Sequence, residues 1–212
     1  MIPSAITDTV FVVDDDASFL KSASRLLRAA GYTVKAFESA SAFLGQLTTE
    51  TSGCVVTDLQ MSGCNGLELQ AALARSDNPL PVVFLSAQGD IPTTVKAMRQ
   101  GAEDFLTKLS PKEKLLEAVN RALARNALER TQREQLRDLR ERFATLSPRE
   151  LEVLSHVVRG KMNKEIAGEL GINLRTVKLH RTNLTRRLQV HSVAELTRLV
   201  EAVGLFKAER TT

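Results

Sequence analysis

Acidic residues follow two apolar segments of the chain, at points where carboxylates can act together. Asp14–Asp16 come directly after the β-branched run Thr9–Val13, and Asp58 comes directly after Cys54–Thr57. Several carboxylates gathered in one place repel one another unless a hard cation lies among them. Mg²⁺ is the favoured cation, because it prefers oxygen ligands, near-octahedral geometry and retained waters.

A hydroxyl and an ammonium group follow two further apolar segments. Ser86 follows Pro81–Leu85, and Lys108 follows Asp104–Thr107. Beside a metal site they would supply charge compensation and donors for the equatorial oxygens of a transferring phosphoryl group. Each feature alone has an ordinary explanation, because such aspartates cap turns or helices and such lysines are solvated surface charges. The joint pattern, in strand order, indicates a phosphoryl-transfer site.

The elements that must position these residues alternate along the first half of the chain. Five short apolar segments have the composition of buried strands: Thr9–Val13, Tyr32–Phe37, Cys54–Thr57, Pro81–Leu85 and Asp104–Thr107. Amphipathic segments of helical period separate them: Ala17–Ala30, Ser39–Leu47, Gly66–Arg75 and Ile91–Gln100. This alternation predicts a flavodoxin-like α/β domain, a five-stranded parallel sheet with helices on both faces. Its ligand site should lie at the carboxyl ends of the strands.

The second half of the chain has the sequence pattern of helices without intervening strands. No Gly or Pro occurs between Pro111, which suits a helix N1 position, and Pro148. We expect one long helix that leaves the first domain and becomes a charged linker. Four short helices of a separate all-α domain follow, with N-caps at Ser147 (in a capping box with Glu150), Asn163, Asn173 and Ser192. The predicted domains are residues 1–125, a helical linker 126–142 and residues 143–212.

Charge separates the two halves. Residues 1–125 carry 12 basic and 14 acidic residues, a net charge of −2, whereas residues 126–212 carry 17 and 11, a net charge of +6. The third short helix, Leu174–Leu188, presents a basic face after the tight turn Gly171–Asn173, while Val177, Leu184 and Leu188 face a core. A helix with such a face suits the major groove of double-stranded DNA. An αα-hairpin with a solvated basic face is the plain alternative.

Composition restricts the remaining classes. The chain of 212 residues is 43% apolar, which suffices for aliphatic cores, and it has two cysteines, Cys54 and Cys64, without metal-ligand spacing. They are expected to be free thiols in a reducing cytoplasm. The chain shows no signal-peptide pattern and no apolar run of about 18 residues. We therefore expect a cytoplasmic protein without a membrane partner.

The segments VVDDD, VVTDLQMSGCNG, FLSAQGD and GAEDFLTK together resemble the receiver domain of two-component response regulators, over about Thr9–Ala124. The resemblance implies that Asp58 is the phosphoacceptor and becomes an aspartyl phosphate. It also implies roles for the surrounding residues. Mg²⁺ would be held by Asp14, Asp15, Asp58 and the backbone carbonyl of Gln60; Ser86 and Lys108 would contact the phosphoryl group; Ser86 and Phe105 would form the switch pair; and Asp16 would cap a helix.

Two positions depart from the family pattern. Ser62 and Leu109 stand where the family usually has proline, and the proline after the lysine usually follows a cis peptide bond. A cis bond before a residue other than proline costs about 2.5–4 kcal/mol. Either the Lys108–Leu109 bond is trans and the loop is reshaped, or the strain is tolerated. These departures motivate an alternative, a DNA-binding transcription factor with a degenerate receiver that works without phosphorylation.

The segments LSPRELEVL and MNKEIAGELGINLRTVKLHRTNLTRRL resemble the LuxR-type helix-turn-helix domain over Leu146–Val203, and the order of the two domains resembles the FixJ-like subgroup. By that resemblance Lys178, Leu179 and Thr182 approach bases. Phosphate or backbone contacts would come from Asn163, Lys164, Thr176 and Arg181. His180 lies on the same basic face, and for a lone histidine a packing role is the alternative to a DNA contact.

The function that follows is a response regulator that accepts a phosphoryl group from a sensor histidine kinase and regulates transcription. It would not be an enzyme beyond its own Mg²⁺-dependent phosphotransfer and autodephosphorylation. We expect a homodimer on phosphorylation, with DNA and RNA polymerase as further partners. Two enzyme or ligand-binding alternatives have less support. A Mg²⁺-dependent phosphatase needs a DxD pair that Asp58-Leu59-Gln60 lacks, and a nucleotide binder needs a glycine-rich loop after a strand.

Overall fold

The structure is a computed structural model that describes residues 9–87 and 90–206. It divides into two compact units, Met1–Arg130 and Thr131–Thr212, and the boundary falls within one long helix, α5 (Lys112–Ala144). This boundary lies inside the predicted linker. Within the described residues, no helix combines the length and the apolar character that a membrane span requires.

The first unit is the predicted parallel sheet. Its strands are β1 (Thr9–Val13), β2 (Thr33–Phe37), β3 (Gly53–Thr57), β4 (Val82–Ser86) and β5 (Asp104–Thr107), in the spatial order β2-β1-β3-β4-β5. All neighbouring pairs are parallel. The helices between them are α1 (Ala17–Ala29), α2 (Ala40–Leu44), α3 (Gly66–Ala74) and α4 (Ile91–Arg99). The predicted fold class is confirmed.

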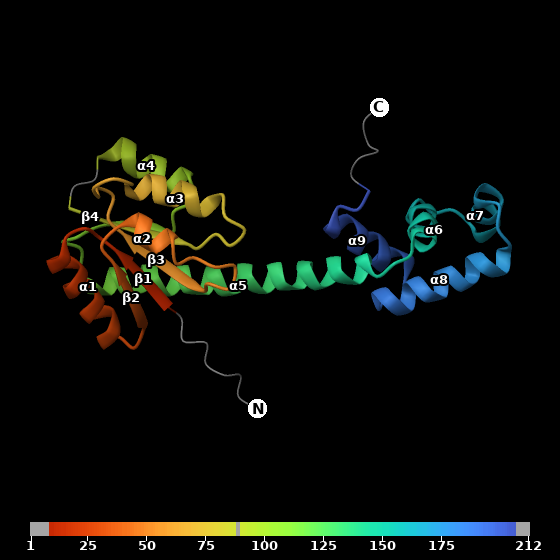
Figure 1. The fold of residues 1–212 in the computed structure, drawn as a ribbon, viewed down its shortest axis with the longest axis horizontal. Coiled ribbons are helices and arrows are strands. Elements are labelled where there is room, and N and C mark those ends of the chain that lie inside the picture. Colours follow the sequence, from red (N-terminus) through yellow and green to blue (C-terminus); the bar gives the residue numbers. More distant parts are fainter. Residues whose placement is uncertain (1–8, 88–89, 207–212) are drawn as a thin grey trace. The chain divides into compact units, whose positions relative to one another are not determined.

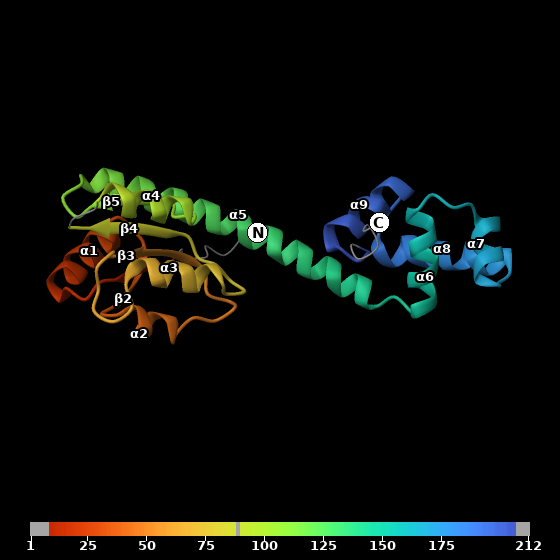
Figure 2. The ribbon, with the colours of Figure 1, turned by 90° about the horizontal axis from the view of Figure 1, so that it is seen from above.

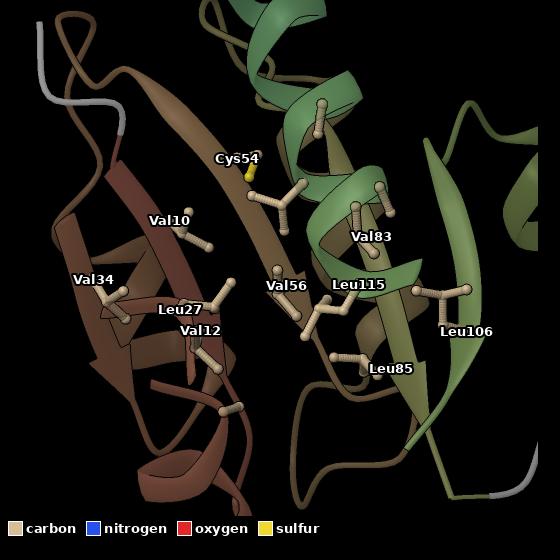
Figure 3. Packing of buried hydrophobic residues seen from close by; sticks show 14 of the residues in the cluster. Val10, Val12, Leu27, Val34, Cys54, Val56, Val83, Leu85, Leu106 and Leu115 are labelled. Atoms are coloured by element: carbon tan, nitrogen blue, oxygen red, sulfur yellow. The ribbon is translucent and has the colours of Figure 1, made fainter. Parts of the chain in front are cut away.

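Helices cover both faces of this sheet (Figures 1 and 2). On one face, side chains of α1 and of the first turns of α5 pack on β1, β3 and β4; Leu27 of α1 and Leu115 of α5 lie over Val12, Val56 and Val83 (Figure 3). On the other face, α2, α3 and α4 enclose an aromatic and aliphatic core, in which Phe43 packs against Phe11 and Phe37. Strands buried on both faces explain the unbroken apolar runs of the sequence.

Helix ends differ from the predicted ones where local bonds stop the helix early. The helix expected over Ser39–Leu47 ends at Leu44, because Gly45 is its C-cap and a separate turn joins Thr48 to Thr51. Pro111 does not occupy N1, since α5 begins at Lys112. Neither difference moves a residue of the predicted site.

The second unit contains α6 (Pro148–Val158), α7 (Asn163–Leu170), α8 (Leu174–Leu188) and α9 (Val193–Val203). The helix α8 packs against α6 and α7 (Figure 1). Val177, Leu184 and Leu188 are buried, as predicted.

The N-caps of this unit follow the sequence with one exception. Ser147, Asn173 and Ser192 each accept a backbone N–H in the first turn of their helix, as predicted. The predicted N-cap at Asn163 is wrong, because α7 begins at that residue and Met162 takes the cap position. The Glu165 carboxylate instead accepts the Met162 N–H at 2.6 Å, which leaves the Asn163 side chain available for another contact.

Candidate functional site

Strand register brings two aspartates together at the carboxyl edge of the sheet. Val13 lies opposite Thr57, and the Asp58 N–H donates to the Val13 carbonyl oxygen at 3.0 Å. Asp14 and Asp58 therefore leave neighbouring strands side by side, with only 1% and 8% of their surfaces exposed. Two carboxylates at this depth need a positive charge between them.

Lys108, directly after β5, supplies that charge. Its Nζ lies 2.6 Å from Asp14 Oδ2 and 2.8 Å from Asp58 Oδ2, so one ammonium group bridges both carboxylates. The same nitrogen lies 4.3 Å from the ring centroid of Phe19 on α1. The aromatic face adds a cation–π attraction and excludes water from one side of the ammonium group.

The pKa directions of Asp14 and Lys108 reflect competition between burial and pairing. Burial raises the pKa of Asp14 above 3.8, and the hydrogen bonds from Lys108 and from the Asp16 N–H offset only part of that rise. For Lys108, burial acts to lower the pKa, but the bonds to Asp14 and Asp58 outweigh it and the pKa lies above 10.5. The lysine is therefore charged at neutral pH.

Asp15 and Asp16 have separate local roles. Asp16 is the N-cap of α1 and accepts the N–H groups of Ser18 and Phe19, as predicted. Asp15 is exposed and accepts the Ser62 N–H at 2.8 Å, a bond that lowers the pKa of this carboxyl below 3.8. In the loop after β3, the Gln60 N–H donates to Asp58 Oδ1 at 3.3 Å. Asp15 therefore does not join the triad around Lys108.

The donor set fits Mg²⁺ by chemistry, since the expected ligands Asp14, Asp15, Asp58 and the Gln60 carbonyl are all oxygen donors. Their placement is not yet that of a metal site. Within the part of the chain that the structure describes, no three His, Cys, Asp or Glu side chains are grouped to hold a metal ion. Lys108 pairs with two of the carboxylates and Ser62 with the third.

The other predicted residues lie around the triad. Ser86 ends β4 and is buried, and its carbonyl oxygen accepts the Lys108 N–H at 2.8 Å. Phe105 is partly buried and packs on Phe84, with ring centroids 5.7 Å apart. The Lys108–Leu109 bond is trans and Leu109 is 93% exposed. Lys108 reaches both carboxylates with this trans bond, so the departure at Leu109 does not displace it.

Two residues of the site were not foreseen from the sequence. Phe19 was assigned only to the apolar face of α1, although it is the platform for Lys108. Gly66 was expected merely to begin a helix, but a Cβ at this position would lie 2.3 Å from the Asp58 carbonyl oxygen. The signal for Gly66 was present, since glycine in the first turn of a helix is a poor helix former and needs a reason such as close backbone approach.

The second unit carries the predicted DNA-binding face on α8. Lys178, Leu179 and Thr182 are exposed, on the side of the helix opposite its buried residues. Leu179 is 59% exposed, which is unusual for a leucine in the middle of a helix that has a core beneath it. Within α7, Lys164 is exposed, and Thr176 of α8 is partly exposed.

Two arginines of α8 are engaged in the fold. Arg181 donates to Asn163 Oδ1 at 3.0 Å, which links the two helices of the helix-turn-helix motif. Arg187 donates to the Thr145 carbonyl oxygen at 2.6 Å and lies 3.5 Å from the buried Glu150 carboxylate. Part of the hydrogen-bonding capacity of these two arginines is therefore used within the fold. His180 is partly buried, consistent with a packing role.

A parallel sheet with a lysine-bridged aspartate pair at its carboxyl edge, followed by a helix-turn-helix unit, is the domain arrangement of DNA-binding response regulators. Comparison with known proteins assigns both parts. Residues 10–120 match the model of the response regulator receiver domain, and residues 144–200 match that of the luxR family of bacterial regulatory proteins.

Full-length relatives share this organisation. The chain is 44% identical to the transcriptional regulatory protein TdiR of Thauera aromatica, covering 91% of this chain and 85% of the relative. It is 36% identical to FixJ of Bradyrhizobium diazoefficiens, covering 92% and 96%. Among solved structures, the response regulator StyR is 48% identical with a TM-score of 0.80, covering 92% of this chain and 98% of StyR. The chain belongs to the FixJ-like, LuxR-type response regulators and is a two-component transcriptional response regulator.

Proposed function

We propose that Asp58 accepts a phosphoryl group from a sensor histidine kinase. The observation that carries this proposal is the Lys108 ammonium group, which lies 2.8 Å from Asp58 Oδ2 and 2.6 Å from Asp14 Oδ2. A carboxylate oxygen of Asp58 attacks the phosphorus of a phosphohistidine, the P–N bond breaks, and the imidazole takes its electron pair. Lys108 then neutralises the added charge on the phosphoryl oxygens.

Magnesium belongs to the same proposal. Bound to Asp14, Asp15, Asp58 and the Gln60 carbonyl, Mg²⁺ would supply further neutralisation of the charge on the transferring group. The chain's own residues orient the nucleophile: the Gln60 N–H bonds one Asp58 oxygen, and Lys108 holds the other. The protein acts on no further substrate in this scheme beyond its own phosphorylation and autodephosphorylation.

The phosphoryl group would act through Ser86 and Phe105. Thr57 lies opposite Phe84, so Ser86, at the end of β4, reaches the same carboxyl edge of the sheet as Asp58. When Ser86 turns to the phosphoryl oxygens, it vacates space into which Phe105 moves. This movement changes the surface that includes α4, which we treat as an element with two conformations. We propose that this shift produces a homodimer, whose paired recognition helices bind DNA more tightly through effective concentration.

The DNA contacts follow the exposed face of the second unit. Lys178, Leu179 and Thr182 would approach base edges, whereas Lys164, Thr176, Asn163 and Arg181 would contact the sugar-phosphate backbone. RNA polymerase would be the next partner at the regulated promoters. Because chromosomal DNA is its proposed partner, the site of action would be the cytoplasm.

The test is phosphoryl uptake from acetyl phosphate with Mg²⁺, followed by intact mass and by the mass of the particle in solution. Wild type is expected to gain a phosphoryl group and to dimerise, whereas Asp58→Asn does neither. Asp16→Asn is the matched control, because it changes a neighbouring aspartate that only caps α1 and should behave as wild type. A wild type that takes up no phosphoryl group overturns the proposal and favours the phosphorylation-independent regulator.

A further inference from the structure

A backbone hydrogen bond in this chain occupies a carboxylate that the proposed magnesium site needs. The Ser62 N–H donates to Asp15 Oδ2 at 2.8 Å, across the gap between the loop after β1 and the loop after β3. Asp15, Gln60 and Ser62 line one open hollow of about 500 Å³, together with Asn65 and Thr93. The bond thus lies at the rim of the region where the cation is expected.

Ser62 is also a position where the chain departs from its family. Proline, the usual residue there, has no backbone N–H and cannot make this bond. The serine therefore supplies a backbone donor that a proline could not, and this donor is directed at the one expected carboxylate ligand that Lys108 does not bridge. A charged acceptor makes the bond stronger than one between neutral groups.

We propose that the Ser62 N–H competes with Mg²⁺ for Asp15 and holds this carboxylate outside the metal site in the metal-free protein. The inference rests on the proposed function, since it concerns the same site. Among the described residues no three acidic side chains are grouped to hold a metal ion, and the Ser62 bond contributes to this together with the pairing of Asp14 and Asp58 with Lys108. Asp15 must then leave the Ser62 N–H before it can bind Mg²⁺. Breaking this hydrogen bond lowers the affinity of the protein for Mg²⁺.

The pKa direction of Asp15 agrees with this role. The Ser62 backbone bond is the largest cause that lowers the pKa of the Asp15 carboxyl, as expected for a hydrogen bond that favours the charged form. The serine hydroxyl is not required by the argument, which permits a sharp pair of variants.

Ser62→Pro removes the N–H, and Ser62→Ala keeps it while removing the hydroxyl. Magnesium affinity of the full chain, measured by calorimetry without a phosphodonor, is expected to rise roughly three- to tenfold in Ser62→Pro, because one hydrogen bond to a charged acceptor no longer opposes binding. Ser62→Ala keeps the backbone bond, which is the larger of the two Ser62 contributions at Asp15, and is expected to stay closer to wild type than Ser62→Pro does. Equal or weaker binding by Ser62→Pro, in a variant with an unchanged melting temperature, overturns the inference.

A second measurement needs no substitution and covers the case in which the proline disturbs the loop. In wild type, hydrogen exchange of the Ser62 amide is expected to accelerate at saturating Mg²⁺, because Asp15 has left it. A Ser62 amide that stays protected with bound Mg²⁺ overturns the competition. If neither wild type nor any variant binds Mg²⁺, the magnesium site of the proposed function fails; if all bind equally, only the role of Ser62 fails.

Discussion

The two units of this protein place their candidate functional residues in opposite surroundings. In the first unit, Asp14, Asp58 and Lys108 lie at the edge of a buried sheet and are already paired with one another. In the second unit, Lys178 and Leu179 stand exposed on α8, while a separate buried face of the same helix holds the fold. Under the proposed function, chemistry and stability depend on the same side chains in the receiver unit and on different ones in the DNA-binding unit.

The difference follows from what each unit must bind. A phosphoryl group is small and densely charged, and it requires donors fixed in advance in a site with little water. DNA is large and its phosphates attract long, mobile basic side chains across solvent. Substitutions in the first site should consequently alter function and folding together, and substitutions on the second face should alter function alone.

The largest expected effect is at Lys108. Lys108→Met should slow phosphoryl uptake from acetyl phosphate by roughly 10²–10³-fold, as the loss of one preorganised charge donor does. It should also destabilise the receiver unit, because Asp14 and Asp58 are left as an unpaired buried pair. Lys112→Met, an exposed lysine at the start of α5, is the control. A Lys108→Met protein with wild-type stability would contradict the coupling of chemistry and folding.

Matched core substitutions test whether the two units fold separately. Leu27 lies in the core of the receiver unit and Leu184 in that of the second unit, and both side chains are almost fully buried. Each Leu→Ala change should cost about 2–5 kcal/mol in its own unit. Calorimetry should show one melting transition lowered and the other unchanged in each variant. Parallel loss of both transitions would show that the long helix couples the cores.

On the DNA-binding face, substitutions should change binding without changing stability. With a sequence selected by wild type from random DNA, Leu179→Ala should lose discrimination of about 1–3 kcal/mol at one base position. Lys164→Ala should weaken binding to all sequences and reduce the salt slope of log K by about one. Fluorescence anisotropy of labelled DNA at several salt concentrations distinguishes the loss of base discrimination in Leu179→Ala from the reduced salt slope in Lys164→Ala. An unchanged salt slope for Lys164→Ala would remove its assignment to phosphate.

The smallest expected effect is on the stability of the second unit and concerns Glu150, which is buried like Asp14 and Asp58 of the receiver unit. Burial acts to raise the pKa of Glu150, but hydrogen bonds from Ser147 and the charge of Arg187 outweigh it, so the pKa lies below 4.5. A depressed pKa contributes stability above pH 4.5 that is lost as the pH falls through the folded-state value. Glu150→Gln should cost about 1 kcal/mol at pH 7, the size of a capping interaction.

This difference between Glu150→Gln and wild type should shrink as the pH falls below 4.5 in chemical unfolding followed by circular dichroism. Glu152→Gln, at an exposed position on the same helix, should change little at any pH because exposed ion pairs contribute little. A Glu150→Gln deficit that persists at low pH would mean that its cost arises from packing.

Much of the architecture could be predicted because it depends on local patterns. Apolar runs buried on both faces predicted the parallel strands, and caps such as Ser147, Asn173 and Ser192 located helix starts. The N-cap predicted at Asn163 was wrong, although asparagine is a good capping residue. The Glu165 carboxylate accepts the backbone N–H of Met162, so Met162 takes the cap position one residue earlier. Local rules fail where two neighbouring residues can each mark the start of the same helix and the folded chain uses only one of them.

The sequence by itself determined the order of strands and helices, the acidic and basic halves, and the set of polar residues that reach the carboxyl edge of the sheet. Only the tertiary structure decided how those residues pair. Lys108 lies between Asp14 and Asp58 above Phe19, Asp15 turns to Ser62, and Arg181 and Arg187 are engaged in the fold. The reason is physical: strand period and burial are encoded residue by residue, whereas a charge chooses its partner from whatever the folded chain brings within hydrogen-bonding distance.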